Sequence, residues 1–219
     1  ITREQADYSV RVLKAVRDAV GPDVEILLDL HRRLSPMHAI DLAERYAEFN
    51  PYYFEEPCMW ENVEALADIK DKVRLPVVTG EAIYAKAGFR PIFQHNAADI
   101  INPDVASCGG ILELKEIAAM AEPYYVAVSP HNYNSTTVAL AATVQASAMM
   151  PNFVITEYFL PFVELGLECC PGMLQPKDGY IDLPTAPGLG IDLDEEALAR
   201  HPGQQFPLRD LRRIGDEGP

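Results

Sequence analysis

The sequence is poor in basic residues: 18 lysines and arginines stand against 33 aspartates and glutamates, giving a formal net charge of −15. Nucleic acids and anionic membranes are bound mainly through clustered lysine and arginine side chains. The shortage of such side chains therefore argues against both as partners. The chain also lacks an apolar run near the roughly 20 residues that cross a bilayer, and it shows no signal peptide.

Cysteine is scarce as well, with only Cys58, Cys108, Cys169 and Cys170 in 219 residues. These residues lack metal-ligand spacing, and a small disulfide-stabilised scaffold would be denser in cysteine. We therefore expect reduced thiols and a cytoplasmic location. The chain is long enough for one sizeable domain, and its composition is that of an ordinary globular protein.

The residues that are present alternate between amphipathic helices and short apolar strands. A helix is expected over 2–21, and another over 35–50 with Ser35 as N-cap and Pro36 at the first helical position. The apolar stripe of the first helix is expected to comprise Val10, Val12, Leu13, Val16 and Val20. The later helices are expected over 62–73, 86–96, 109–124 and 136–150.

Six strands are expected between these helices, over 24–31, 51–57, 75–81, 98–104, 126–131 and 152–158. They are short and nearly all apolar, which is typical of a parallel sheet that is covered on its faces. Each ends in a polar residue, and these residues lie 23 to 27 positions apart: Asp29, Glu55, Glu81, Asp104, His131 and Glu157. A polar residue at every carboxyl end of a strand is how a (β/α)8 barrel builds an active site. A doubly wound sheet also alternates, but its site gathers at one switch point.

The pattern changes near residue 160. Residues 1–160 are therefore expected to form the barrel part of the chain. Residues 161–219 are rich in proline and glycine, and they are expected to form an extension packed outside the barrel.

Three carboxylates, Asp29, Glu55 and Glu81, end adjacent strands of this predicted barrel. Converging carboxylates repel one another unless a cation lies between them, and oxygen ligands suit Mg²⁺ first and Mn²⁺ next. Each acid alone could also be a solvated strand end or the partner of a basic residue. Strand alternation sends Glu55 and Glu56 to opposite faces, and the spacing favours Glu55 with an uncertainty of one residue.

Asp104 and His131 end the next two strands. A carboxylate beside an imidazole fixes its tautomer and raises its basicity, which suits a general base. Glu157 could orient a substrate, supply a proton, or simply face water at its strand end. Gly109 and Gly110 could leave backbone N–H groups for an anion, or they could serve loop geometry alone.

Seven motifs occur in a specific order along the chain: "DLH", "EEP", "GE", "ADIINPD", "GGI", "PH" and "TEY". In this order and spacing they resemble the mandelate racemase/muconate lactonizing enzyme-like branch of the enolase superfamily, and "PGLGIDLDEEAL" resembles its C-terminal return. The resemblance implies an α/β fold comprising the C-terminal six βα units of a (β/α)7–8 TIM-like barrel, with a C-terminal extension. It also implies an N-terminal capping domain and two first barrel strands, the second normally with a Lys-x-Lys pair, which this chain does not contain. We expect that missing part as another chain or as a segment of a longer polypeptide, and we expect a homo-oligomer.

The resemblance also implies roles for the strand-end residues. Asp29, Glu55 and Glu81 correspond to the Mg²⁺ ligands, and His131 with Asp104 corresponds to the dyad that removes the proton alpha to a carboxylate. Glu157 corresponds to the acid near the carboxylate of a small-molecule substrate.

His31 distinguishes between reactions within this branch. Asp-x-His, as in Asp29 and His31, resembles sugar-acid dehydratases of the galactonate type, whereas the racemase type has Asp-x-Asn. The resemblance thus implies that His31 protonates a departing beta-hydroxyl in an Mg²⁺-dependent dehydration of an aldonate or aldarate to a 2-keto-3-deoxy acid. Alternatives are a racemase, epimerase or cycloisomerase acting on a carboxylate, and a non-catalytic sugar-acid binder. The string "PHNYNSTT" departs from the galactonate dehydratase pattern and leaves the particular sugar acid open.

Overall fold

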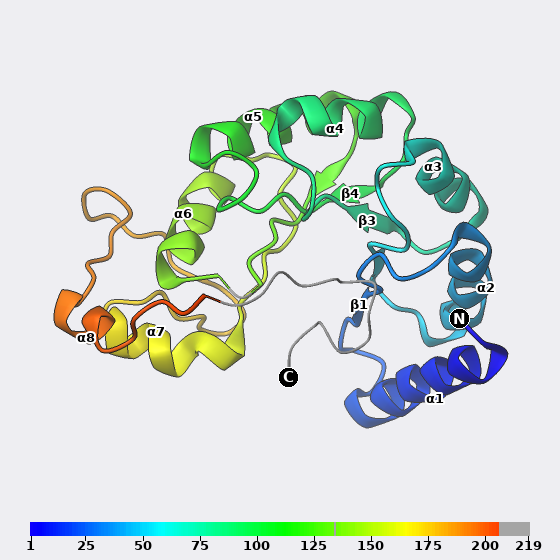
Figure 1. The fold of residues 1–219 in the computed structure, drawn as a ribbon, viewed down its shortest axis with the longest axis horizontal. Coiled ribbons are helices and arrows are strands. Elements are labelled where there is room, and N and C mark those ends of the chain that lie inside the picture. Colours follow the sequence, from blue (N-terminus) through cyan, green and yellow to red (C-terminus); the bar gives the residue numbers. More distant parts are fainter. Residues whose placement is uncertain (134, 206–219) are drawn as a thin grey trace.

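The computed structural model describes residues 1–133 and 135–205. In these residues one parallel sheet runs in the order β1-β2-β3-β4-β5, which is also the order of the strands along the chain. The strands are β1 Leu27–Asp29, β2 Tyr53–Glu55, β3 Val77–Thr79, β4 Ile100–Ile101 and β5 Ala127–Val128. Figure 1 shows the helices that connect them along the outside of a curved sheet, which is the arrangement of a partial (β/α) barrel.

The helices occupy the segments that the apolar periodicity predicts. They are α1 Arg3–Val20, α2 Pro36–Tyr46, α3 Val63–Lys72, α4 Ala85–Gln94, α5 Ile111–Ala121 and α6 Thr137–Ser147. Short 3-10 turns follow α2 at Ala47–Phe49 and α5 at Glu122–Tyr124. Beyond the barrel, a 3-10 turn at Leu160–Phe162 leads into α7 Val163–Cys169, and α8 Glu195–Ala199 packs against α7.

The first two helices begin at the predicted positions, and of these two only α1 has a side-chain cap. Thr2 and Gln5 form a reciprocal capping box on α1, and Gly21 ends that helix with a φ of 78°. Ser35 is the N-cap residue of α2 and Pro36 its first residue, as predicted. The Ser35 hydroxyl, however, lies 2.9 Å from Nδ1 of His38 and makes no capping bond to a backbone N–H.

The predicted apolar stripe of α1 is wrong in part. Val12, Val16 and Val20 are 45, 41 and 40% exposed, whereas Leu13 is buried and Ala6, which the prediction omitted, is buried with it. The helix packs on α2, and the face that contains Ala6 and Leu13 is the one turned toward it. Helical periodicity identifies apolar faces but not which of them meets the neighbouring helix.

The sixth predicted strand is reduced to a single bridge between Val128 and Phe153. The N–H of Val128 donates to the carbonyl of Asn152, and the N–H of Val154 donates back to the carbonyl of Val128. The next bond of this ladder would need an N–H at Pro130, which proline lacks. The Thr156 hydroxyl donates to the Pro130 carbonyl instead, at 2.8 Å, so the pairing continues through a side chain.

Alternation along the strands separates the core from the inner face of the sheet. Phe54, Val77 and Ile101 belong to the main apolar cluster, which lies between sheet and helices. Tyr53 and Val78 belong to a second, smaller cluster that also contains Ile100. Because side chains two residues apart share a face, Glu55 and Asp104 follow the direction of this second cluster, toward the interior of the curved sheet. Glu81 lies three residues after Val78 and follows Gly80, whose φ is 141°.

The extension predicted for 161–219 is described as far as residue 205, and residues 206–219 lie outside the described residues. Its division from the barrel at residue 160 stays a prediction. The four cysteines are all buried as free thiols. No helix within 1–133 and 135–205 has both the length and the apolar character needed to cross a membrane.

Candidate active site

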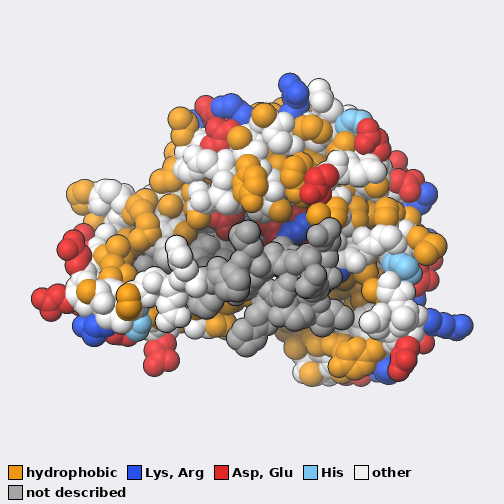
Figure 2. All heavy atoms as spheres, viewed as in Figure 1, with side chains coloured by type: hydrophobic (Ala, Val, Ile, Leu, Met, Phe, Trp, Pro, Cys, Tyr) orange, Lys and Arg blue, Asp and Glu red, His pale blue; other side chains and the backbone are white. Residues whose placement is uncertain are grey.

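All the site residues predicted from the sequence meet at the carboxyl ends of the strands. Asp29 and Glu55 are direct partners in the register of β1 and β2. The negative charges of Asp29, Glu157 and Glu81 all act on Glu55. Figure 2 shows acidic side chains together with a basic one near the middle of this face of the molecule. Four of the six predicted strand-end residues therefore belong to one electrostatically coupled cluster.

Glu81 lies at the centre of this cluster, between two imidazoles. Its Oε2 lies 3.3 Å from Nε2 of His131, and its Oε1 lies 3.7 Å from Nε2 of His31. Oε2 of Glu157 approaches the same Nε2 of His131, at 3.8 Å. Each histidine consequently lies against a different oxygen of one carboxylate, which brings two groups able to exchange protons to a common centre.

Asp104 fixes the orientation of His131. Its Oδ2 lies 2.6 Å from Nδ1 of the imidazole, and its Oδ1 accepts a hydrogen bond from the N–H of Ala106 at 2.7 Å. Nδ1 therefore carries the proton that is shared with Asp104, and Nε2 faces the cluster. Burial alone would lower the pKa of His131, but the hydrogen bond that its Nδ1 donates to Asp104 and the charges of Glu157 and Glu81 outweigh it and raise that pKa.

The cluster holds more negative charge than its surroundings neutralise. Burial, and then the charges of Asp29, Glu157 and Glu81, raise the pKa of Glu55 to about 9. Burial is also the main cause that raises the pKa values of Asp29 and Glu157. A hard divalent cation would relieve this repulsion, and carboxylate oxygens are the donors that Mg²⁺ and Mn²⁺ prefer.

The donor set of Asp29, Glu55 and Glu81 therefore fits the predicted metal in its chemistry. The positions of these side chains do not yet form a metal site, because no group of three or more His, Cys, Asp or Glu side chains in the described part of the chain is arranged to hold an ion. The metal assignment stays a prediction.

Arg32 is a member of the cluster that the sequence reasoning missed. Its Nη1 is hydrogen-bonded to Oε1 of Glu81 and lies 3.2 Å from Oε2 of Glu56. The side chain is only 10% exposed, so both contacts are sheltered from solvent. A basic residue directly after the strand-end motif "DLH" was the available signal, but its direction depends on the turn that follows β1.

Both carboxylate oxygens of Glu56 contact neighbouring protein groups. Its Oε1 accepts hydrogen bonds of 2.8 Å from the Thr79 hydroxyl and from the N–H of Gly80. Its Oε2 faces Arg32. Glu56 therefore ties β2 to the end of β3, and Glu55 is the acid of this pair that alternation places on the inner face, as the spacing predicted.

Asn102 was also missed. Its Nδ2 donates to Oε1 of Glu55, and its Oδ1 accepts a hydrogen bond of 3.1 Å from the N–H of Glu81. The side chain is 2% exposed. Asn102 precedes Asp104 by two positions, so a stricter use of period-two alternation would have found it on the same face.

The Gly109–Gly110 pair serves loop geometry. Their φ angles of 126° and 90° belong to conformations that side chains rarely adopt. A Cβ on Gly109 would lie 2.9 Å from the side chain of Glu113. An acidic side chain beside these glycines opposes anion binding, which was the alternative interpretation of the motif.

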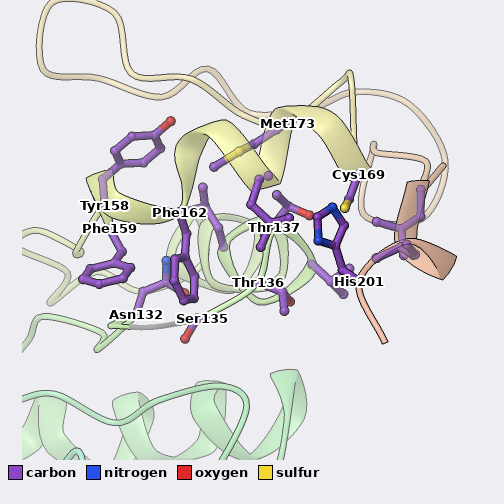
Figure 3. Close-up of a pocket in the computed structure, with 16 residues that line it drawn as sticks. Asn132, Ser135, Thr136, Thr137, Tyr158, Phe159, Phe162, Cys169, Met173 and His201 are labelled. Carbon is purple, nitrogen blue, oxygen red and sulfur yellow. The ribbon is translucent and has the colours of Figure 1, made fainter. Parts of the chain in front are cut away.

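A separate apolar cavity of about 270 Å³ lies between α6, α7 and α8. Figure 3 shows Phe162, Met173 and Cys169 among its lining side chains, with Asn132 at one side. The N–H of Asn132 donates to Oε2 of Glu157 at 2.6 Å, so the cavity borders the acidic cluster. The predicted metal ligands and the two site histidines are not among its lining residues.

Residues 1–197 match the family model described as Enolase C-terminal domain-like. The chain is 34% identical over 209 residues to a D-galactonate dehydratase family member of Streptomyces bingchenggensis, covering 94% of this chain and 50% of that protein. It is 33% identical over 200 residues to the D-galactarolactone cycloisomerase of Agrobacterium fabrum, covering 88% of this chain and 53% of that protein. The chain thus spans about half the length of the curated relatives it matches.

Solved structures agree in fold. A mandelate racemase/muconate lactonizing enzyme-like protein from Rubrobacter xylanophilus superposes with a TM-score of 0.88 at 35% identity, covering 94% of this chain and 53% of that one. A member of the enolase superfamily from Salmonella Typhimurium gives a TM-score of 0.86 at 33% identity, covering 91% and 51%. The predicted partial barrel and the resemblance noted in the motifs are confirmed.

Proposed function

Because the chain belongs to the enolase C-terminal domain-like family, we propose that it supplies the acid–base site of a dehydratase acting on an aldonic or aldaric acid. Relatives named D-galactonate, D-xylonate and D-gluconate dehydratase support the substrate class. The observation that carries the proposal is the pair of histidines at the two carboxylate oxygens of Glu81, one of them held by Asp104.

The first step of the proposed reaction belongs to His131. Its Nε2 takes the proton alpha to the substrate carboxylate, while Asp104 keeps Nδ1 protonated and stabilises the imidazolium that forms. The electron pair of the broken C–H bond moves toward the carboxylate. Glu157, within 3.8 Å of the base, lies where it can orient that end of the substrate.

The second step belongs to His31. Its imidazole donates a proton to the beta-hydroxyl, the C–O bond breaks and water leaves. The resulting enol takes up a proton at carbon 3 and becomes a 2-keto-3-deoxy acid. The two histidines need to reach opposite sides of one substrate, which the placement of Glu81 between them allows.

Asp29, Glu55 and Glu81 would hold a divalent cation, Mg²⁺ or Mn²⁺, in this proposal. The bound ion would supply Lewis-acid stabilisation of the charge that develops on the carboxylate oxygens. Asn102 would position two of the three ligands, because it contacts the carboxylate of Glu55 and the backbone of Glu81.

A screen of aldonic and aldaric acids with Mg²⁺ tests the proposal, with 2-keto acid formation measured by semicarbazone absorbance. We expect at least one acid to be converted, and we expect chelation of the metal to stop the conversion. Parallel incubations in D₂O record deuterium at the alpha carbon. A protein that forms no keto acid and exchanges no alpha proton with any of these acids would contradict the proposal.

A cycloisomerase is the second candidate, because one relative carries that name at 33% identity. Both reactions begin with removal of the same kind of proton, so His131 and Asp104 serve either one. The products differ in composition: an isomer keeps the mass of its substrate, whereas a dehydration product is lighter by one water. Mass spectrometry of the products from open-chain acids and from aldarolactones therefore distinguishes the two.

His31→Asn should separate the two steps of the proposed dehydration. Exchange of the alpha proton should continue at close to the wild-type rate, because His131 and Asp104 are untouched. Keto acid formation should fall by about 10²–10⁴-fold, the usual contribution of a general acid. Deuterium incorporation and semicarbazone absorbance, measured on the same samples, give both rates.

His95→Asn is the matched control, since His95 is exposed at the end of α4 and lies outside the cluster. It should leave both rates unchanged. If His31→Asn dehydrated its substrate at the wild-type rate, the assignment of His31 as the acid would be wrong, although the role of His131 would stand.

A further inference from the structure

The acidic cluster already contains a cation of its own. Arg32 contacts Glu81 at Oε1 and Glu56 at Oε2, and its side chain is 10% exposed. Glu81 is at the same time the acid that connects the two histidines and one of the three candidate metal ligands. A fixed positive charge therefore binds one of the two oxygens of a carboxylate that a divalent cation would use.

The backbone holds Arg32 in this position by a strained turn. His31 and Arg32 have φ angles of 47° and 61°, in the left-handed region that costs energy for residues other than glycine. The N–H of Arg32 donates to the carbonyl of Glu56 at 2.7 Å, and the N–H of His31 donates to Oδ1 of Asp29. These bonds turn the chain back over the strand ends and bring the guanidinium to the acids.

The two contacts of Arg32 differ in what else depends on them. Glu56 is completely buried and is also held by Thr79 and Gly80, so its carboxylate has little freedom. Glu81 lies nearer the open side of the cluster, where its carboxylate meets His31 and His131. The contact with Glu81 can be exchanged without unpairing Arg32, because Glu56 remains as its partner.

We propose that Arg32 and a divalent cation are alternative partners of Glu81. In the metal-free protein the guanidinium neutralises part of the carboxylate repulsion and keeps the ligands together. When the ion binds, it takes the Glu81 oxygen and Arg32 stays on Glu56, because a guanidinium and a dication repel each other at one oxygen. Arg32 is then a positioning residue that sets metal affinity. This inference rests on the proposed metal-dependent function.

Arg32→Met tests the competition in the full chain, with Mn²⁺ and Mg²⁺ as probes. We expect the variant to bind Mn²⁺ on the order of tenfold more tightly by isothermal titration, because no guanidinium has to leave Glu81. We also expect its melting temperature in EDTA to fall below that of the wild type, since Glu56 and Glu81 lose their cation. The gain in melting temperature on adding Mn²⁺ should be larger than in the wild type.

Arg45→Met is the matched control. Arg45 also pairs with two carboxylates, Asp7 at 2.7 Å and Asp41 at 3.8 Å, but it lies on α2 outside the cluster. Its loss removes one positive charge from the chain and should leave Mn²⁺ affinity unchanged. Titrations at low and high KCl add a second check, because salt screens long-range attraction but not direct competition at a sheltered oxygen.

The possible outcomes distinguish the competition between Arg32 and the cation from the proposed metal-dependent function. Equal Mn²⁺ affinity in wild type and Arg32→Met, or weaker binding in the variant, overturns the competition and leaves the metal-dependent function standing. Binding by the variant alone supports the competition and contradicts metal dependence of the wild type. Absence of binding in both proteins overturns both.

Discussion

His131→Ala should lower both exchange of the substrate's alpha proton and keto acid formation by about 10²–10⁴-fold, the range expected for the loss of a general base. The reason is geometric. Nε2 of His131 faces the centre of the cluster 3.3 Å from Glu81, and Nδ1 is held by Asp104 at 2.6 Å. Asp104, Glu81 and Glu157 are all carboxylates in contact with this one imidazole, and none of them replaces its basicity.

Asp104→Asn should produce a smaller loss of the same kind. The amide keeps a hydrogen bond to Nδ1, but it can also donate its own proton there and so stabilise the tautomer whose Nε2 cannot act as a base. Deuterium exchange at the alpha carbon, followed by NMR, measures both variants directly.

His95→Ala serves as the control for both variants and should exchange the proton at the wild-type rate. Circular dichroism establishes that each variant is folded before its rate is compared. Normal alpha-proton exchange in His131→Ala would mean that another group is the base, and the proposed first step would then be wrong.

Glu56→Ala should reduce the free energy of unfolding of the metal-free protein by about 3 kcal/mol, because it removes one of the two partners of the sheltered Arg32 charge and leaves buried hydrogen-bond donors without their acceptor. The carboxylate accepts from the Thr79 hydroxyl and from the N–H of Gly80, and it pairs with Arg32. Its side chain is 0% exposed, so water cannot take its place without opening the fold.

Glu55→Ala is the matched comparison for Glu56→Ala, because the two acids are adjacent in the sequence and both are buried. Glu55 accepts from Asn102, but burial and then the neighbouring charges raise its pKa to about 9, so its removal also ends an unfavourable placement of this acid. In EDTA we expect Glu55→Ala to lower the free energy of unfolding much less than Glu56→Ala does. We also expect Glu55→Ala to bind Mn²⁺ more weakly than the wild type.

Urea unfolding in EDTA measures both differences. If Glu56→Ala does not fold, Glu56→Gln provides the measurement, since the amide keeps the shape and one acceptor oxygen but loses the charge that pairs with Arg32. Equal destabilisation by the Glu55 and Glu56 variants would contradict the division of roles between these two acids.

Much of the site could be predicted from the sequence because its positions follow local rules. Side chains alternate across a strand, and parallel strands bring their carboxyl ends to one edge, so a polar residue at each end predicts a common site. Asp29, Glu55, Asp104 and His131 are placed in this way, Glu81 follows its strand after Gly80, and the structure brings all five together. Their chemical roles came from a family resemblance.

Contacts between elements could not be predicted in the same way. Arg32 reaches the cluster only because a left-handed turn follows β1 and because β2 and β3 place Glu56 and Glu81 beside it. The ladder at residues 152–154 stops because Pro130, on the neighbouring strand, has no N–H to offer.

The sequence by itself determined the alternation of helices and strands, the polar residues at the strand ends and the helix start at Ser35–Pro36, since each depends on residues close together in the chain. The tertiary structure decided that the buried Glu56 links β2 to the end of β3 and that α1 packs through Ala6 and Leu13. It also decided that Arg32 pairs with Glu81. The physical reason is that burial and charge pairing depend on which distant segments become neighbours, and local periodicity does not encode that choice.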